Sequence, residues 1–277
     1  SRTPDEIVGE IAGLVAGGYK EIILTGIHLG HYGVELTRGR SGRAPFRLWH
    51  LIERLNEIPG DWRLRLSSLE AAEVGPDFIR SLQGFERLCP HFHLCLQSGS
   101  DRVLYQMKRR YRSGRFLEKL DMLREVCHEP AFSTDVIVGF PGETEADFQE
   151  TLATCEAAGF MKIHVFPFSP RKGTPAAGFP QQIAAAEKKE RCQRLSELEA
   201  RLAARYHSRL IGEPLQVLVE ARPASRPGYV LGTACRYVPV ELPGTEGDIG
   251  ELVDVQAEYS LGSAVSAARR ELSPCLR

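Results

Sequence analysis

The spacing of apolar residues predicts helices that alternate with short buried strands over residues 1–209. Thr3 is a candidate N-cap, with Pro4 at the first helical position and Glu6 completing a capping box. The apolar run at 21–26 ends in glycine, as expected for a buried parallel strand. The same reasoning predicts further helices at 48–58, 76–82, 116–127 and 144–158, and further strands at 63–67, 92–96, 132–138 and 162–166. Five strands separated by helices indicate a parallel α/β fold.

The pattern changes after a long charged helix predicted at 181–209, which carries an apolar stripe that would brace the sheet. Beyond it, short apolar runs separated by Gly and Pro clusters predict a small antiparallel β domain, with strands near 215–220, 228–232, 237–241 and 251–258. We therefore expect two domains, 1–209 and 210–277. Because the α/β part opens with a helix, we also expect a first strand and its loop to precede Ser1.

Composition narrows the class of protein. The 277 residues carry a net charge of -1, so any binding of nucleic acid must come from local patches. The sequence has neither an apolar stretch long enough to cross a membrane nor the start of a signal peptide. Its seven cysteines are odd in number and scattered, unlike a disulfide framework. These features predict a cytoplasmic protein that does not bind membranes.

The five predicted strand ends share small, glycine-rich and hydroxyl-bearing residues, at 25–30, 66–70, 96–100, 138–143 and 166–171. Ligands gather at the carboxyl ends of strands in parallel α/β folds, and small residues let a ligand approach the backbone closely. A plain turn is the simpler explanation for any one of these ends. Five of them on one edge of one sheet favour a binding site for a polar cofactor made of several parts.

Six segments resemble successive blocks of the methylthiotransferase branch of the radical S-adenosylmethionine (SAM) superfamily. They are 25–33 (TGIHLGHYG), 66–70 (LSSLE), 93–101 (HLCLQSGSD), 107–111 (MKRRY), 135–144 (DVIVGFPGET) and 168–176 (FSPRKGTPA). The first block most resembles enzymes that methylthiolate N6-threonylcarbamoyladenosine beside the anticodon of tRNA. The C-terminal part is similar to the TRAM β-barrel, which helps hold tRNA in that family. The resemblance implies a partial (β/α) barrel of radical SAM type that lacks its first strand, followed by a TRAM-like domain.

The resemblance also implies which residues surround SAM. Thr25, Gly26 and His28 would lie near its methionine end, and Arg110 would pair with its carboxylate as a bidentate donor. The positions implied near its amino-acid and ribose parts are Ser68, Glu70 and Gln97, and those near its adenine are Val138, Gly139 and Phe140.

The densest basic cluster, at 108–112, contains an aromatic residue and predicts contacts to RNA phosphates and bases. A solvated helix end explains the same cluster equally well. The residues expected to contact substrate RNA are Arg109, Arg112, Arg171, Lys172, Arg236 and Tyr237. Between 210 and 260 the β domain has three basic residues against eight acidic ones. We therefore expect the partial (β/α) barrel to make more of the contacts with RNA.

Two features concern metals. A metal site is one interpretation of four residues near a predicted strand, Cys89, His91, His93 and Cys95, because alternate strand positions point to one face. We instead expect core side chains there, because no second Cys or His pair stands nearby at a ligand spacing. The family holds a catalytic [4Fe-4S] cluster with a Cys-x-x-x-Cys-x-x-Cys loop, and the sequence contains no such triad. We therefore expect no catalytic or metal-ligating residue in this chain.

The family's missing parts define the expected partners. We expect the cluster loop within a few residues upstream of Ser1, in a polypeptide whose N-terminal domain carries a second, sulfur-donating cluster. The resemblance implies that tRNA and donors of sulfur and electrons are the other partners. The barrel's own task would be to position the cofactor and exclude water.

Three other functions stay open. One is methylthiolation of a ribosomal protein, which a comparison of tRNA and protein substrates would distinguish. Another is a metal-independent barrel enzyme with a Schiff-base lysine, although Lys20 and Lys162, the lysines nearest strands, lie away from strand carboxyl ends. The last is a non-catalytic RNA-binding protein that has lost its clusters, for which binding of SAM is the discriminating observation.

Overall fold

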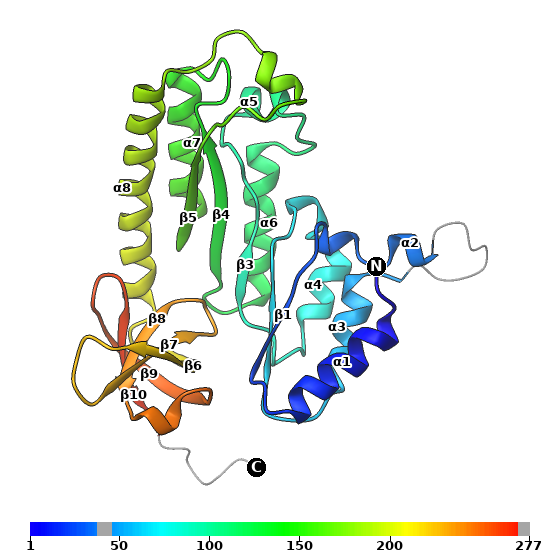
Figure 1. The fold of residues 1–277 in the computed structure, drawn as a ribbon, viewed down its shortest axis with the longest axis vertical. Helices are drawn as coiled ribbons and strands as arrows, with labels where there is room; N and C mark the ends of the chain where they lie inside the picture. Colours follow the sequence, from blue (N-terminus) through cyan, green and yellow to red (C-terminus); the bar gives the residue numbers. More distant parts are fainter. Residues whose placement is uncertain (38–45, 271–277) are drawn as a thin grey trace. The chain divides into compact units, whose positions relative to one another are not determined.

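The structure is a computed structural model that describes residues 1–37 and 46–270. The helices are α1 (Pro4–Ala16), α2 (Val34–Thr37), α3 (Leu48–Asn56), α4 (Pro76–Leu82), α5 (Asp101–Gln106), α6 (Ser113–Val126), α7 (Glu145–Ala158) and α8 (Ala185–Arg209). The strands are β1 (Glu21–Leu24), β2 (Arg63–Leu66), β3 (His91–His93), β4 (Ala131–Val138), β5 (Lys162–Pro167), β6 (Pro214–Pro223), β7 (Tyr229–Ala234), β8 (Pro239–Pro243), β9 (Leu252–Ser260) and β10 (Val265–Arg269) (Figure 1). Short 3-10 turns are η1 (Leu29–His31), η2 (Ala71–Glu73), η3 (Pro175–Gly178) and η4 (Glu246–Asp248).

The predicted fold class is confirmed. The parallel strands β1–β2 form one sheet and β3–β4–β5 another, and β6 to β10 close into a barrel. The chain divides into two compact units, each described separately below. Unit 1 comprises the described residues of Ser1–Ser67, Pro76–His91 and His207–Arg277, and unit 2 comprises Ser68–Gly75 and Phe92–Tyr206. That 210–277 form a domain of their own stays a prediction.

The α/β part of unit 1 follows the predicted elements closely. The capping box predicted for α1 is present, because Thr3 N donates to Glu6 Oε2 at 2.7 Å and Glu6 N donates to Thr3 Oγ1 at 3.4 Å. β1 pairs with β2 in parallel, with Glu21 opposite Arg63. α3 packs between α1 and α4 and buries Leu48, Leu51, Ile52 and Leu55 (Figure 1).

The C-terminal barrel differs from the predicted antiparallel domain in two respects. Its order is β10-β8-β7-β6-β9, and the pairing of β10 with β8 is parallel, whereas its other pairs are antiparallel. β10 was not predicted, because its Val-Ser-Ala-Ala-Arg sequence lacks the bulky apolar alternation of a strand. Val265, Ser266 and Ala267 are nevertheless buried, which their small side chains allow.

Two buried arginines of β2 join the parallel sheet of unit 1 to this barrel. Arg63 donates to the carbonyls of Gln216 at 2.6 Å and Thr233 at 2.9 Å. Arg65 donates to the carbonyls of Cys235 at 3.0 Å and Ala234 at 3.1 Å. Both guanidiniums also bind the Glu21 carboxylate of β1, through their Nε atoms at 2.6 and 2.9 Å. The sequence predicts this strand but gives no sign that its two charges are buried.

Unit 2 places the three-stranded sheet beside α6, α7 and α8 (Figure 1). Phe132, Thr134, Val136 and Val138 of β4 are buried, whereas Asp135 and Ile137 on the other face are partly exposed. β3 is shorter than predicted, and Gln97 continues it through an isolated bridge to Val136. Gly99 then passes so close to α7 that a Cβ there would lie 2.6 Å from Thr151 Cα. Within the described residues, no helix is both long and apolar enough to span a membrane.

Candidate functional site

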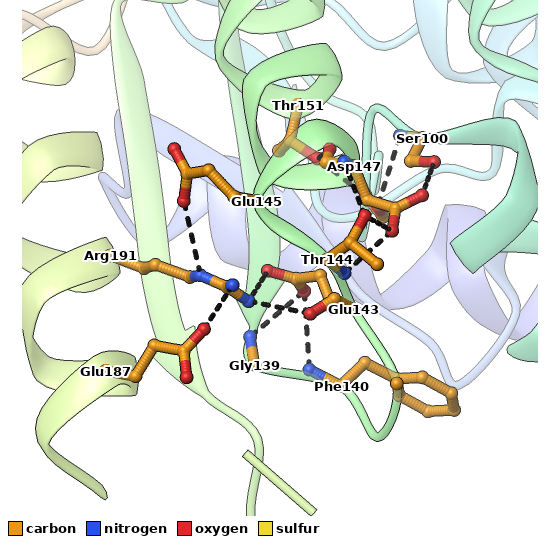
Figure 2. A network of polar contacts seen from close by, with 12 residues as sticks. Ser100, Gly139, Phe140, Glu143, Thr144, Glu145, Asp147, Thr151, Glu187 and Arg191 are labelled. Atoms are coloured by element: carbon orange, nitrogen blue, oxygen red, sulfur yellow. Dashed lines mark hydrogen bonds and ion pairs between the residues drawn. The ribbon is translucent and has the colours of Figure 1, made fainter. Parts of the chain in front are cut away.

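The turn at the carboxyl end of β4 is built around a buried carboxylate. Glu143 Oε2 accepts the backbone N–H of Gly139 at 3.0 Å and of Phe140 at 3.3 Å (Figure 2). Glu143 Oε1 accepts from Arg191 Nη1 of α8 at 2.9 Å, and both side chains are only 3% exposed. Burial raises the pKa of Glu143, against the opposing effect of the Arg191 charge. The carboxylate therefore fixes the conformation of the 139–143 turn.

Arg191 is in turn held by acidic neighbours and an aromatic ring. Its Nη2 pairs with Glu187 one turn away on α8, and its Nε lies 4.0 Å from Glu145 Oε2 (Figure 2). Its guanidinium carbon lies 5.6 Å from the centre of the Phe148 ring. The same guanidinium contacts Glu143 and two glutamates nearer the surface. Through these contacts, α8 holds the 139–143 turn in place.

The first turn of α7 ties this loop to the end of β3. Asp147 and Thr144 form the predicted capping pair, with Thr144 N donating to Asp147 Oδ2 at 2.7 Å. Asp147 also accepts from Ser100 Oγ at 2.8 Å and from Arg102 Nε at 3.0 Å. Although burial opposes it, the hydrogen bonds from Arg102 and Thr144 hold the pKa of Asp147 below its usual range. One carboxylate thus orders two strand-end loops.

We expect Asp147→Asn to lower the free energy of unfolding by about 1.5–3 kcal/mol at neutral pH, the range for hydrogen bonds to charged groups. The folded pKa of Asp147 is depressed, so its contribution is present above the ordinary value of 3.8 and is lost as the pH falls below it. Urea unfolding at neutral and acidic pH should show the difference from wild type shrinking with acid. Asp121→Asn, which removes an exposed partner of Arg124, is the control with little effect.

Gly139 and Phe140 give the turn its shape. Gly139 has φ +74°, which favours glycine, and a Cβ there would lie 2.2 Å from Lys188 Cγ, so any other residue would have to displace the Lys188 side chain of α8. The Phe140 ring packs edge-on against Phe168 at 5.2 Å and Phe179 at 6.2 Å between centroids. Because both N–H groups are already bound to Glu143, this turn offers a ligand its aromatic ring and carbonyls rather than amide donors.

A cavity of about 370 Å³ lies against this aromatic cluster in unit 2. Its walls are mainly apolar, with Lys108 and Arg109 as the charged members; they are Gln106, Met107, Lys108, Arg109, Ile137, Phe140, Phe168, Thr174, Pro175, Ala176 and Phe179. This volume is within the usual range for small-molecule sites. Gln106 contributes to the wall, although its Oε1 atom is itself buried and has no hydrogen-bond partner among the described residues.

A second, basic cavity of about 820 Å³ adjoins the first and shares Gln106, Lys108 and Arg109 with it. Its remaining lining residues are Tyr105, Arg110 and Arg112. Tyr105 is 71% exposed, and the Arg112 guanidinium lies 5.7 Å from its ring centre. We call this surface (Tyr105, Gln106, Lys108, Arg109, Arg110 and Arg112) the basic groove. It combines cations, which bind phosphates, with an exposed aromatic ring, on which a base can stack. Proteins that bind single-stranded nucleic acid have this combination.

Buried hydrogen bonds hold the basic groove in place. The aromatic residue inside the predicted cluster, Tyr111, is buried, and its hydroxyl donates to the carbonyls of Cys95 at 2.8 Å and Leu96 at 3.0 Å. Tyr111 is therefore an anchor and not a base contact, and Tyr105, which the sequence analysis did not single out, provides the exposed ring. Arg109 Nη1 lies 3.8 Å from Glu70 Oε1, while Arg110 is exposed and has no ion pair with a described residue.

The remaining residues implied for SAM have varied surroundings. In unit 2, Val138 is buried, Ser68 is exposed and Gln97 is buried, with its N–H bound to the Asp135 carbonyl at 2.8 Å. Gln97 also has φ +64°, a left-handed conformation that is strained for a non-glycine residue. In unit 1, the loop after β1 exposes Thr25, Gly26 and His28.

The RNA-contact predictions need one correction. Arg236 is only 6% exposed, packed beside the Cys235 sulfur at 3.6 Å, so it does not present its charge to a phosphate. Tyr237 is half-exposed, but its ring stacks on His91 at 4.7 Å and lies under Arg65 at 5.0 Å. Arg171 and Lys172 are both exposed in the loop after β5. The sequence shows Arg236 as one of few basic residues in the barrel but gives no sign of its burial.

Comparison with known proteins gives the family. The family model described as "Radical SAM superfamily" matches residues 1–155. The chain belongs to the radical SAM superfamily. The chain also resembles the solved structure of the radical SAM methyltransferase TsrM from Kitasatospora setae, with a TM-score of 0.50, 14% identity, and coverage of 64% of this chain and 33% of that one. At that identity the likeness concerns the fold alone.

Among curated relatives, threonylcarbamoyladenosine tRNA methylthiotransferase MtaB of Thermotoga maritima is 38% identical over 95% of this chain and 58% of its own length. The enzyme of the same name from Bacillus subtilis is 35% identical over 100% of this chain and 62% of its own. A tRNA-2-methylthio-N(6)-dimethylallyladenosine synthase of Symbiobacterium thermophilum is 37% identical over 92% of this chain and 54% of its own length. The chain thus spans less than two thirds of the length of these relatives.

Proposed function

We propose that this chain is the cofactor-binding and RNA-binding part of a cytoplasmic tRNA methylthiotransferase, which adds a 2-methylthio group to N6-threonylcarbamoyladenosine beside the anticodon by radical SAM chemistry. The observation that carries the proposal is the apolar cavity beside Phe140 that opens onto the basic groove within unit 2. The names of the two MtaB relatives support the choice of substrate.

The residues of the cavity fit the nucleoside end of SAM. Adenine has broad apolar faces, and the cavity is lined by the aromatic rings of Phe140, Phe168 and Phe179. Bound SAM supplies the radical chemistry of this superfamily. The aromatic cluster would exclude water from the adenine, and the free guanidinium of Arg110 would pair with a carboxylate. Contacts from Thr25, Gly26, His28, Ser68, Glu70 and Gln97 belong to the same proposal.

The residues of this chain do not fit the superfamily's [4Fe-4S] cluster. None of the seven cysteines stands in a Cys-x-x-x-Cys-x-x-Cys arrangement, and the two nearest in sequence, Cys89 and Cys95, differ in character, one buried and one partly exposed. We propose that the cluster ligands, the second cluster, and the contacts with sulfur and electron donors belong to parts of the polypeptide outside these 277 residues.

We expect the chain to bind SAM and Phe168→Ala to weaken that binding by about 1.5–3 kcal/mol, because the substitution removes an aromatic wall of the cavity. This corresponds to a dissociation constant raised about tenfold or more, measured by isothermal titration calorimetry. Phe166→Ala, which removes a half-exposed ring two residues earlier, is the matched control with unchanged affinity. Equal affinities of the two variants would contradict the assigned cavity.

We expect the basic groove to bind phosphates of the RNA backbone. The triple substitution of Arg109, Arg110 and Arg112 by alanine should weaken tRNA binding and reduce the slope of log affinity against log salt by about 1 for each phosphate that is no longer neutralised. Filter binding at several salt concentrations measures both effects. The control replaces Arg80, Arg201 and Arg205, exposed arginines elsewhere, and leaves the salt slope unchanged. A triple variant of the groove that binds like this control would remove the groove from the RNA surface.

A further inference from the structure

Three side chains from adjacent parallel strands converge on the partly exposed face of the unit 2 sheet. They are His93 of β3, Asp135 of β4 and His164 of β5, and one nitrogen or oxygen atom of each lies within 4.8 Å of the others. Asp135 and His164 face each other in the β4–β5 register, and the two imidazole centroids are 5.6 Å apart. His93 Nε2 lies 3.4 Å from Asp135 Oδ1. The sheet geometry therefore brings three potential ligands to one point.

Neighbouring groups orient these side chains. Ser133 Oγ lies 3.0 Å from His93 Nδ1, which occupies that nitrogen and turns Nε2 toward Asp135. The Cys95 thiol lies 3.8 Å from Asp135 Oδ2, the other carboxylate oxygen. A histidine that binds a metal through one nitrogen commonly uses its second nitrogen in such a hydrogen bond, which fixes the ring.

The donor set indicates the ion. Two imidazoles and one carboxylate suit Zn²⁺ and similar first-row divalent cations, whereas Mg²⁺ and Ca²⁺ prefer all-oxygen surroundings. Three protein ligands leave one position of a tetrahedral ion open to water or another ligand. We propose that His93, Asp135 and His164 form a Zn²⁺ site, separate from the apolar cavity and the basic groove, whose linings contain none of the three residues.

The competing occupant of this space is a proton shared between His93 and Asp135. Such an ion pair would use two of the three groups and leave His164 outside the interaction. The sequence places potential ligands near His93 only on the same strand, which favours a core side chain there. The other two groups lie 42 and 71 residues further along the chain, at no recognisable ligand spacing.

The test is a titration of the untagged 277-residue chain with Zn²⁺, followed by calorimetry, and with Co²⁺, followed by its visible absorption. We expect one equivalent to bind, with the intense bands of tetrahedral Co²⁺. Asp135→Asn and His164→Ala should abolish this binding, and Ser133→Ala should weaken it by about 10- to 100-fold. His31→Ala, which removes an exposed histidine of unit 1, should leave it unchanged.

Two results would overturn the proposal. One is the absence of stoichiometric binding by the folded wild-type chain, which would leave the proton as the occupant. The other is binding that survives both Asp135→Asn and His164→Ala, which would assign the metal to other groups such as cysteine thiols. Circular dichroism checks that each variant is folded, and the wild-type Co²⁺ spectrum reports the coordination without any variant. The titration uses neither SAM nor tRNA, so its outcome is independent of the proposed function.

Discussion

Replacing Arg191 with methionine is expected to lower the free energy of unfolding by about 3–5 kcal/mol, the usual cost of removing one partner of a buried ion pair. The substitution leaves the Glu143 carboxylate buried, with only the N–H groups of Gly139 and Phe140 as partners. The turn beside the apolar cavity should lose its fixed conformation, so SAM binding should weaken together with stability. Urea unfolding followed by circular dichroism measures the first effect and calorimetry the second.

The pH dependence and two further variants distinguish this account from a general packing defect. Burial raises the pKa of Glu143, and without Arg191 it rises further, so the loss of stability should shrink as the pH falls and Glu143 becomes protonated. The double variant Glu143→Gln, Arg191→Met should recover part of the loss. Arg194→Met breaks a more exposed pair with Glu145 and should cost less than about 1 kcal/mol. A pH-independent loss in Arg191→Met would contradict the account.

Replacing Glu21 with leucine is expected to cost a similar amount, about 3–5 kcal/mol, in unit 1. The change leaves Arg63 and Arg65, each 2% exposed, without their shared carboxylate. Both arginines would then be buried with uncompensated positive charges. They would still donate hydrogen bonds to backbone carbonyls of β6, of β7 and of the residue after β7. We therefore expect faster hydrogen exchange of the amides of β6 and β7 as well as a lower unfolding midpoint.

The control for Glu21 is Asp61→Leu. Asp61 pairs with Lys20 at 3.0 Å, but its side chain is 63% exposed, so its loss should change stability by less than about 1 kcal/mol. Hydrogen exchange of β6 and β7 should also stay as in wild type. If Glu21→Leu resembled this control, the buried arginines would not depend on Glu21 for their charge balance.

The sequence predicted most elements because local signals and periodicity agree in them. Thr3 with Glu6 and Thr144 with Asp147 mark two helix starts correctly, and α4 has the predicted bounds. β2 shows where periodicity stops being informative. Its alternating Arg-Leu-Arg-Leu pattern suggests that one face is exposed to solvent, yet both arginines are buried. The carbonyls that accept their hydrogen bonds belong to residues about 150 or more positions away in the sequence.

The candidate site was predictable in part for the same reason. The strand-end motifs are contiguous in sequence, so the 139–143 turn could be singled out as a unit. Its partner Arg191 could not, since it is one of many charged residues of α8 and only packing distinguishes it. Likewise, Tyr105 and Tyr111 carry the same side chain six positions apart, but only the fold exposes the first and buries the second.

The central claim, that this chain serves methylthiolation of tRNA, is tested most directly by the nucleosides of tRNA in the host organism. Its gene is deleted, total tRNA is digested, and the nucleosides are measured by liquid chromatography with mass spectrometry. We predict that 2-methylthio-N6-threonylcarbamoyladenosine disappears, that N6-threonylcarbamoyladenosine accumulates, and that a plasmid copy of the gene reverses both changes. An unchanged level of the methylthiolated nucleoside in the deletion strain would contradict the claim.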